Sequence, residues 1–130
     1  MKRSEMREQA FFLTFENLFD TQENIEELIE LYSDNVEPVS DYAKEIFAGV
    51  TKNIEKLDSI INCYSHSWKS TRLPKVTLAV LYVALYEMKF VESVPDSVAI
   101  NEAVELAKKY ACADDASYIN GILGAFSRGA

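Results

Sequence analysis

The stretch that most restricts the possible folds is residues 74–90, PKVTLAVLYVALYEMKF, which has no charged side chain from residue 76 to residue 86. A surface helix needs one apolar stripe, so a helix with two has to be covered on both sides. Pro74 suits a first helical turn, where its missing N–H is not needed. We therefore predict a central helix around which the chain packs. Its two stripes at helical spacing are Leu78, Leu81, Leu85 and Met88, and Val76, Ala79, Val80, Val83 and Ala84.

Length and composition place the other segments in helices as well. The chain has 130 residues, enough for one domain, which we expect to span residues 1–130. Its four glycines and three prolines are too few for the turns of a many-stranded β fold. The uncharged run is shorter than the roughly 20 residues that cross a bilayer, so no membrane partner is expected. The predicted fold class is all-α.

Apolar spacing predicts about seven helices and no strand. The first covers residues 4–20, has an aromatic face and ends at residues 20–22. Ser40 or Asp41 caps the third helix, in which Gly49 lets a neighbour approach closely. The others are expected at residues 25–32, 54–64 and 74–90, from the break at 93–97 to about Tyr110, and from Asp115 or Ser117 onward.

The net charge of −8 is unevenly distributed along the chain. Residues 16–45 hold ten carboxylates against the single cation Lys44, whereas Lys2, Arg3 and Arg7 make the N-terminus basic. The acidic stretch has two interpretations, a solvated face or a docking surface for a basic partner. The three basic residues are interleaved with Glu5 and Glu8, and on their own they are a weak signal for nucleic-acid binding.

Candidates for catalysis or metal binding are few, so we expect no enzyme, no metal site and no cofactor. Cys63 and His66 are three residues apart, and with Cys112 they offer at most three soft ligands in loose spacing. The simpler interpretation is two buried thiols and a half-exposed histidine. His66 beside Ser65 and Ser67 is more often a coincidence than a catalytic dyad. Two cysteines form no disulfide framework, which favours a reducing cytoplasm.

Several polar and aromatic residues in the last third of the chain could have structural roles. Asn101 and Asn120 fall in helical, partly buried segments, where we expect their amides to tie adjacent helices together. Gly121 would let the last helix approach another backbone. Tyr118 is either the half-buried edge of the core or a platform for an unpaired base.

Two blocks in the second half of the chain carry a family resemblance. VPDSVAINEAVELAKKY at residues 94–110, followed by NGIL at residues 120–123, resembles the transcription antitermination factor NusB. Leu73-Pro74, Leu81 and ALYE at residues 84–87 are similar to the central helix of that family. IFAGV at residues 46–50, Leu57-Asp58 and REQA at residues 7–10 extend the similarity over nearly the whole chain.

The resemblance implies an all-α fold of two packed helical subdomains and a role in transcription. In the family, NusB pairs with the ribosomal protein NusE. The pair binds boxA RNA of nascent transcripts and nucleates a complex on RNA polymerase, which then reads through terminators on ribosomal RNA operons. By position, the resemblance implies RNA contacts at Lys2, Arg3, Arg7 and Tyr118, and partner contacts at Glu87 and Asp114.

The sequence departs from the family pattern at two places. Ser4, Glu5 and Met6 stand where more basic residues are expected, and Tyr82 stands at a position that is often arginine. Fewer phosphate contacts mean weaker RNA binding and greater reliance on a partner. The alternative function is a protein-interaction module of the same fold with little RNA binding of its own. An exposed Tyr82 face is one place for a homodimer contact.

Overall fold

The computed structural model describes residues 1–19, 24–66 and 68–129, and in these ranges it contains seven α-helices, a short 3₁₀ helix and no strand. The all-α prediction is confirmed. None of the described helices is long and apolar enough to cross a membrane. In chain order the elements are α1 (Arg3–Phe19), α2 (Ile25–Asn35), α3 (Asp41–Lys52), α4 (Ile54–Tyr64), η1 (Ser70–Arg72), α5 (Lys75–Phe90), α6 (Asp96–Tyr110) and α7 (Ala113–Arg128).

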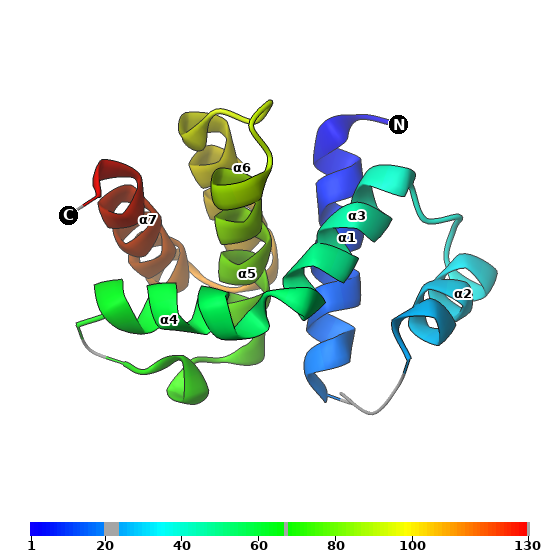
Figure 1. The fold of residues 1–130 in the computed structure, drawn as a ribbon, viewed down its shortest axis with the longest axis horizontal. Helices are drawn as coiled ribbons and strands as arrows, with labels where there is room; N and C mark the ends of the chain where they lie inside the picture. Colours follow the sequence, from blue (N-terminus) through cyan, green and yellow to red (C-terminus); the bar gives the residue numbers. More distant parts are fainter. Residues whose placement is uncertain (20–23, 67, 130) are drawn as a thin grey trace.

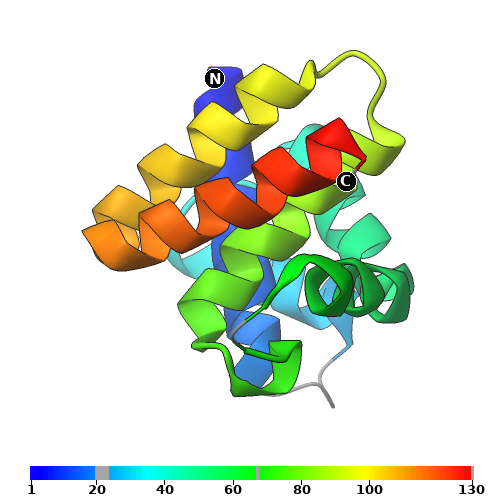
Figure 2. The ribbon, with the colours of Figure 1, turned by 90° about the vertical axis from the view of Figure 1, so that its left-hand side faces the viewer.

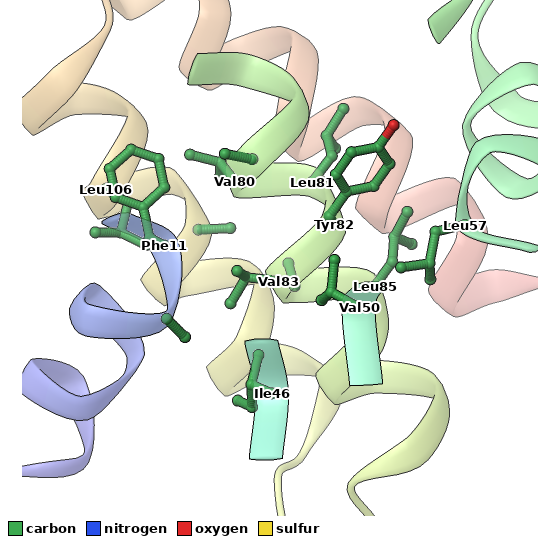
Figure 3. Packing of buried hydrophobic residues seen from close by; sticks show 14 of the residues in the cluster. Phe11, Ile46, Val50, Leu57, Val80, Leu81, Tyr82, Val83, Leu85 and Leu106 are labelled. Atoms are coloured by element: carbon green, nitrogen blue, oxygen red, sulfur yellow. The ribbon is translucent and has the colours of Figure 1, made fainter. Parts of the chain in front are cut away.

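Helix α5 is the central helix that the sequence predicts. It contacts α1, α3, α4, α6 and α7, and every residue from Ala79 to Leu85 is buried. Val80 lies towards Phe11 of α1 and Leu106 of α6, while Leu57 of α4 packs on the opposite side of α5 (Figure 3). The two apolar stripes are therefore covered by different neighbours, as a helix without a polar face requires.

The helices form two groups that meet along α5. Helices α1, α2 and α3 lie on one side, and α4 to α7 form the other group, with α7 at the far edge from α1 (Figure 1). Within the second group α6 and α7 run side by side across α5 (Figure 2). This arrangement agrees with the two packed subdomains that the resemblance implies. Helix α2 packs chiefly against α1 and lies at the outer edge of the molecule.

Several local predictions about the ends and contacts of helices are confirmed. Ser40 caps α3, because its side chain accepts a hydrogen bond from the backbone N–H of Ala43 at 3.2 Å. Gly49 does allow a close approach, since a Cβ there would lie 2.2 Å from Cζ of Tyr86. Helix α7 begins at Ala113, two residues before Asp115 and four before Ser117, the two predicted starts. The predicted end of α1 at residues 20–22 lies outside the described residues.

Other predictions about burial are wrong. Asn101 and Asn120 are exposed on α6 and α7, and nothing lies within 4 Å of a Cβ built on Gly121. Tyr82 is 3% exposed and donates a hydrogen bond to Asp58, so it offers no apolar face to a second copy. Helical spacing identifies which residues share a face, but only the neighbouring helices decide whether that face is covered.

Candidate RNA and partner interface

The N-terminal basic residues begin α1 and occupy two different environments. Lys2 and Arg3 are exposed, and the Arg3 guanidinium lies 3.8 Å from the centroid of the Tyr42 ring. A cation over an aromatic face is attracted by the negative potential of the ring, which fixes the guanidinium without neutralising it. Arg3 is therefore oriented by the protein and still carries a charge that a phosphate group can reach.

Arg7 is buried and forms an ion pair inside the protein. Its Nε lies 2.7 Å from Glu87 Oε1, its second terminal nitrogen lies 2.8 Å from Glu87 Oε2, and the first lies 3.1 Å from Glu102 Oε1. The Tyr42 hydroxyl donates to Oε2 of the same glutamate. We call Arg7, Tyr42, Glu87 and Glu102 the Arg7 cluster. It joins α1, α3, α5 and α6, and each buried charge has a partner.

The Arg7 cluster raises the pKa of two of its members, Arg7 and Tyr42. Burial by itself would lower the pKa of Arg7, but the hydrogen bonds and the charge of Glu87 outweigh that effect, and the pKa is raised. For Tyr42, burial has the opposite effect and raises the pKa, and the hydrogen bond to Glu87 adds to the increase. Near neutral pH, Arg7 therefore stays a cation and Tyr42 stays a neutral hydrogen-bond donor.

These contacts place two of the expected site residues inside the protein. Arg7 is 2% exposed and Glu87 is 0% exposed, so neither side chain reaches the surface in this structure. The resemblance implies an RNA contact for Arg7 and a partner contact for Glu87, whereas the structure places both inside the same ion pair. Glu87 also accepts the hydrogen bond of Tyr42, whose ring lies under the guanidinium of Arg3.

A second candidate surface lies around Trp68, between the start of α5 and the start of α7. We call it the Trp68 groove, and it brings together Tyr118 and Asp114, both singled out from the sequence. Trp68 is 54% exposed, and Tyr118 is half-buried and shares a hydrogen bond with Ser65. The groove therefore contains two aromatic rings on which a base could stack, those of Trp68 and Tyr118. It also contains a cation, Arg72. The groove is lined by Trp68, Arg72, Leu73, Pro74, Thr77, Asp114, Asp115 and Tyr118.

Sequence reasoning missed Trp68 and Arg72 as members of this groove. The signal was present, because the only tryptophan of the chain stands in the polar and basic segment SWKSTR at residues 67–72. Such a tryptophan has no apolar periodicity around it, which argues against a core position. What the sequence did not contain was the proximity of this segment to Tyr118, which is about 50 residues away and comes from the packing of α7.

An aromatic groove adjoins the Trp68 groove, and the two share Pro74. Phe19 is 63% exposed there, and its ring lies edge-on to that of Phe15 with 5.0 Å between the ring centroids. Exposed aromatic side chains in a concave surface are typical of protein-binding sites. The aromatic groove is lined by Phe11, Phe12, Phe15, Glu16, Phe19, Pro74, Lys75, Val76 and Tyr110.

The residues expected to bind RNA therefore fall into two places. Lys2 and Arg3 lie at the start of α1, whereas Tyr118 lies on α7, and α1 and α7 are on opposite sides of α5 (Figure 1). The hollow between α1 and α6, next to Lys2 and Arg3, is not a strongly positive surface. It is lined by three cations and four carboxylates, among them Lys109, which pairs with Glu8 at 2.9 Å.

The candidates for metal binding or catalysis are not brought together. Among residues 1–19, 24–66 and 68–129, no group of three histidine, cysteine or acidic side chains is placed to hold a metal ion. Cys63 and Cys112 are both exposed, so the expectation of buried thiols is wrong, and Cys112 Sγ lies 3.0 Å from Asp115 Oδ2. His66 is exposed, and the predicted neighbour Ser67 lies outside the described residues.

Comparison with known proteins decides the family. The model of the NusB family matches residues 4–128 of this chain. The chain belongs to the NusB family. The transcription antitermination protein NusB of Agathobacter rectalis is 37% identical over 131 residues, which cover 98% of this chain and all of that protein.

Solved structures of NusB agree with this assignment. T. maritima NusB is 31% identical and superposes with a TM-score of 0.87, covering 98% of this chain and 92% of that one. A structure of antitermination factors NusB and NusE in complex with dsRNA contains a chain that is 26% identical, with a TM-score of 0.88, covering 98% of this chain and 97% of that one. The NusB fold therefore extends over almost the whole chain.

Proposed function

We propose that this NusB chain forms a single domain over residues 1–130 and acts in the cytoplasm as a transcription antitermination factor. It binds boxA RNA of nascent transcripts together with the ribosomal protein NusE. The pair joins the RNA polymerase antitermination complex, which reads through terminators on ribosomal RNA operons. Relatives named transcription antitermination protein NusB support the role, and the NusB–NusE structure with dsRNA supports both binding partners.

The observation that carries the RNA-binding proposal is the Trp68 groove. Unpaired bases bind proteins mainly by stacking on aromatic side chains, and Trp68 and Tyr118 provide two such surfaces in one hollow. Arg72 adds a cation for the backbone phosphate. Asp114 and Asp115 of α7 also line the groove and repel phosphate, so the bases rather than the backbone are expected to face α7.

The position of the aromatic groove supports binding by a pair of proteins. It meets the Trp68 groove at Pro74, so a partner seated on Phe15 and Phe19 would stand next to RNA in the Trp68 groove. Two weak RNA surfaces held in one rigid complex bind more tightly than either does alone. We propose NusE as this partner, and we propose that Asp114, which lines the Trp68 groove, makes a polar contact with NusE or RNA.

Lys2 and Arg3 are proposed to form a second, purely electrostatic contact with the RNA backbone. Replacing both with glutamate should weaken boxA binding by the pair about tenfold and make it less sensitive to salt, because about two phosphate contacts are lost. Fluorescence anisotropy with labelled boxA RNA over a series of salt concentrations measures both quantities.

The matched control is the double change Lys52→Glu and Lys56→Glu, which alters the net charge equally at two exposed lysines on α3 and α4. If this control weakens binding as much as the N-terminal double variant does, the effect is one of overall charge, and the proposed contact is wrong. Unchanged affinity and salt dependence in the N-terminal variant would also rule it out.

The second candidate function is a protein-interaction module with little RNA binding of its own. The burial of Arg7 favours it, because the ion pair with Glu87 leaves only Lys2 and Arg3 as exposed basic side chains at the N-terminus of α1. The net charge of −8 also opposes RNA binding at long range. The two functions differ in whether boxA is preferred over a scrambled RNA.

A further inference from the structure

Helices α1 and α2 enclose an apolar groove on the outer edge of the molecule, which we call the α1–α2 groove. Its side chains include Leu31, which is 54% exposed, and Val36, which is 64% exposed. Large apolar side chains that open into one hollow are typical of a binding surface rather than of a solvated face. The groove is lined by Phe12, Leu13, Glu16, Leu28, Leu31, Tyr32, Asn35 and Val36.

The rim of the α1–α2 groove is negative. Glu27 precedes Leu31 by four residues and Asp34 follows it by three, so both share its face of α2. Glu16 stands across the groove on α1. Burial raises the pKa of Tyr32 in the groove wall, and the negative charges of Glu37 and Glu8 add to the increase.

None of the salt bridges among the described residues involves this rim. In the part of the chain that the structure describes, the salt bridges involve Glu8, Glu87, Glu102 and Glu105, and none reaches a carboxylate between residues 16 and 45. Residues 20–23, which lie outside the described ranges, have the sequence DTQE and so contain no basic side chain. The rim therefore keeps its negative charge, and a positively charged binding partner would offset that charge.

We propose that the α1–α2 groove binds a basic amphipathic helix of another protein. Helices dock in hydrophobic grooves through apolar side chains at helical spacing, and the carboxylates at the rim select lysine and arginine beside those anchors. A second copy of this chain fits poorly, because two acidic α2 helices would face each other. RNA and anionic lipid surfaces are repelled by the same charges.

This groove is distinct from the surface proposed for RNA. It contains none of Lys2, Arg3, Trp68 or Tyr118, and it shares with the aromatic groove only Phe12 and Glu16. A helix bound there would leave the Trp68 groove open, so the chain would hold RNA and a basic protein segment at the same time. The proposal therefore goes beyond the RNA-binding function, and either can fail without the other.

The probe is a synthetic helical peptide of about 15 residues, in which leucines at helical spacing form one face and lysines the other. NMR spectra of the ¹⁵N-labelled chain, titrated with the peptide, should shift at Leu31, Tyr32 and Val36. Two matched peptides serve as controls: one with glutamate in place of lysine, the other with serine in place of leucine. We expect both to bind at least tenfold more weakly.

Two variants of the chain complete the test. Leu31→Ser should weaken binding of the leucine–lysine peptide at least tenfold, whereas Val98→Ser, at a 42% exposed valine on α6, should leave it unchanged. Equal binding of the serine peptide would show simple charge attraction and overturn the proposal. Shifts centred outside the α1–α2 groove, or Leu31-dependent self-association in sedimentation, would also overturn it. BoxA binding measured on the same Leu31→Ser sample shows whether the RNA function fails separately.

Discussion

Replacing Glu87 with alanine is expected to lower the free energy of unfolding by about 3–5 kcal/mol, the usual cost of leaving one charge of a buried pair without its partner. The guanidinium of Arg7 would lose both of its bonds to Glu87 and keep only the contact with Glu102 at 3.1 Å. The Tyr42 hydroxyl would lose its acceptor. Urea unfolding followed by circular dichroism measures the change.

A rescue variant separates the ion pair from general damage. The double change Arg7→Met and Glu87→Leu removes both charges, and apolar replacement of a whole buried pair is often neutral or stabilising. It should recover most of the stability that Glu87→Ala loses. Glu105→Ala is the control, because Glu105 and Lys108 form an exposed pair that contributes little. Wild-type stability in Glu87→Ala would contradict the role given to the Arg7 cluster.

Replacing Trp68 with alanine is expected to weaken boxA binding by the pair about tenfold or more, since base–aromatic stacking contributes about 1–3 kcal/mol per base. The side chain is 54% exposed, so the change should leave the fold intact. Trp68 is the only tryptophan of the chain, and its fluorescence should therefore be quenched when boxA RNA occupies the groove. Titration of unlabelled RNA into the wild-type pair tests this directly.

Two further variants make the Trp68 result specific. Trp68→Phe keeps an aromatic face and should retain most of the affinity. Phe90→Ala removes a 39% exposed aromatic side chain at the opposite end of α5 and should not affect RNA binding. If Trp68→Ala binds boxA as well as the wild type does, the Trp68 groove is not an RNA contact.

The fold could be predicted because its signals are local. The stripes of α5 and the side-chain cap at Ser40 each depend on residues within a few positions of one another. The sequence predicts the start of α7 at Asp115 or Ser117, at least two residues late, because Asp114 and Asp115 are both acceptable in a first helical turn.

The site could be predicted only in part, because it depends on long-range packing. Arg3 and Arg7 are four residues apart on α1, yet Arg3 is exposed over Tyr42 of α3, whereas Arg7 is buried and bonds to Glu87 of α5. The partner of Arg7 is 80 residues away in the sequence, and spacing alone does not reveal it. The sequence predicts that Asn101 and Asn120 are partly buried. Nothing in the neighbouring sequence shows that other helices leave their faces of α6 and α7 uncovered.

The most direct test of the proposed function is the affinity for boxA RNA and for a scrambled RNA, measured across a salt series with the chain alone and with NusE. We expect tight binding with a preference for boxA only when NusE is present, and a decrease in affinity as salt increases. Equal affinity of the pair for boxA and scrambled RNA would contradict the proposed function and leave a protein-interaction module of the NusB fold.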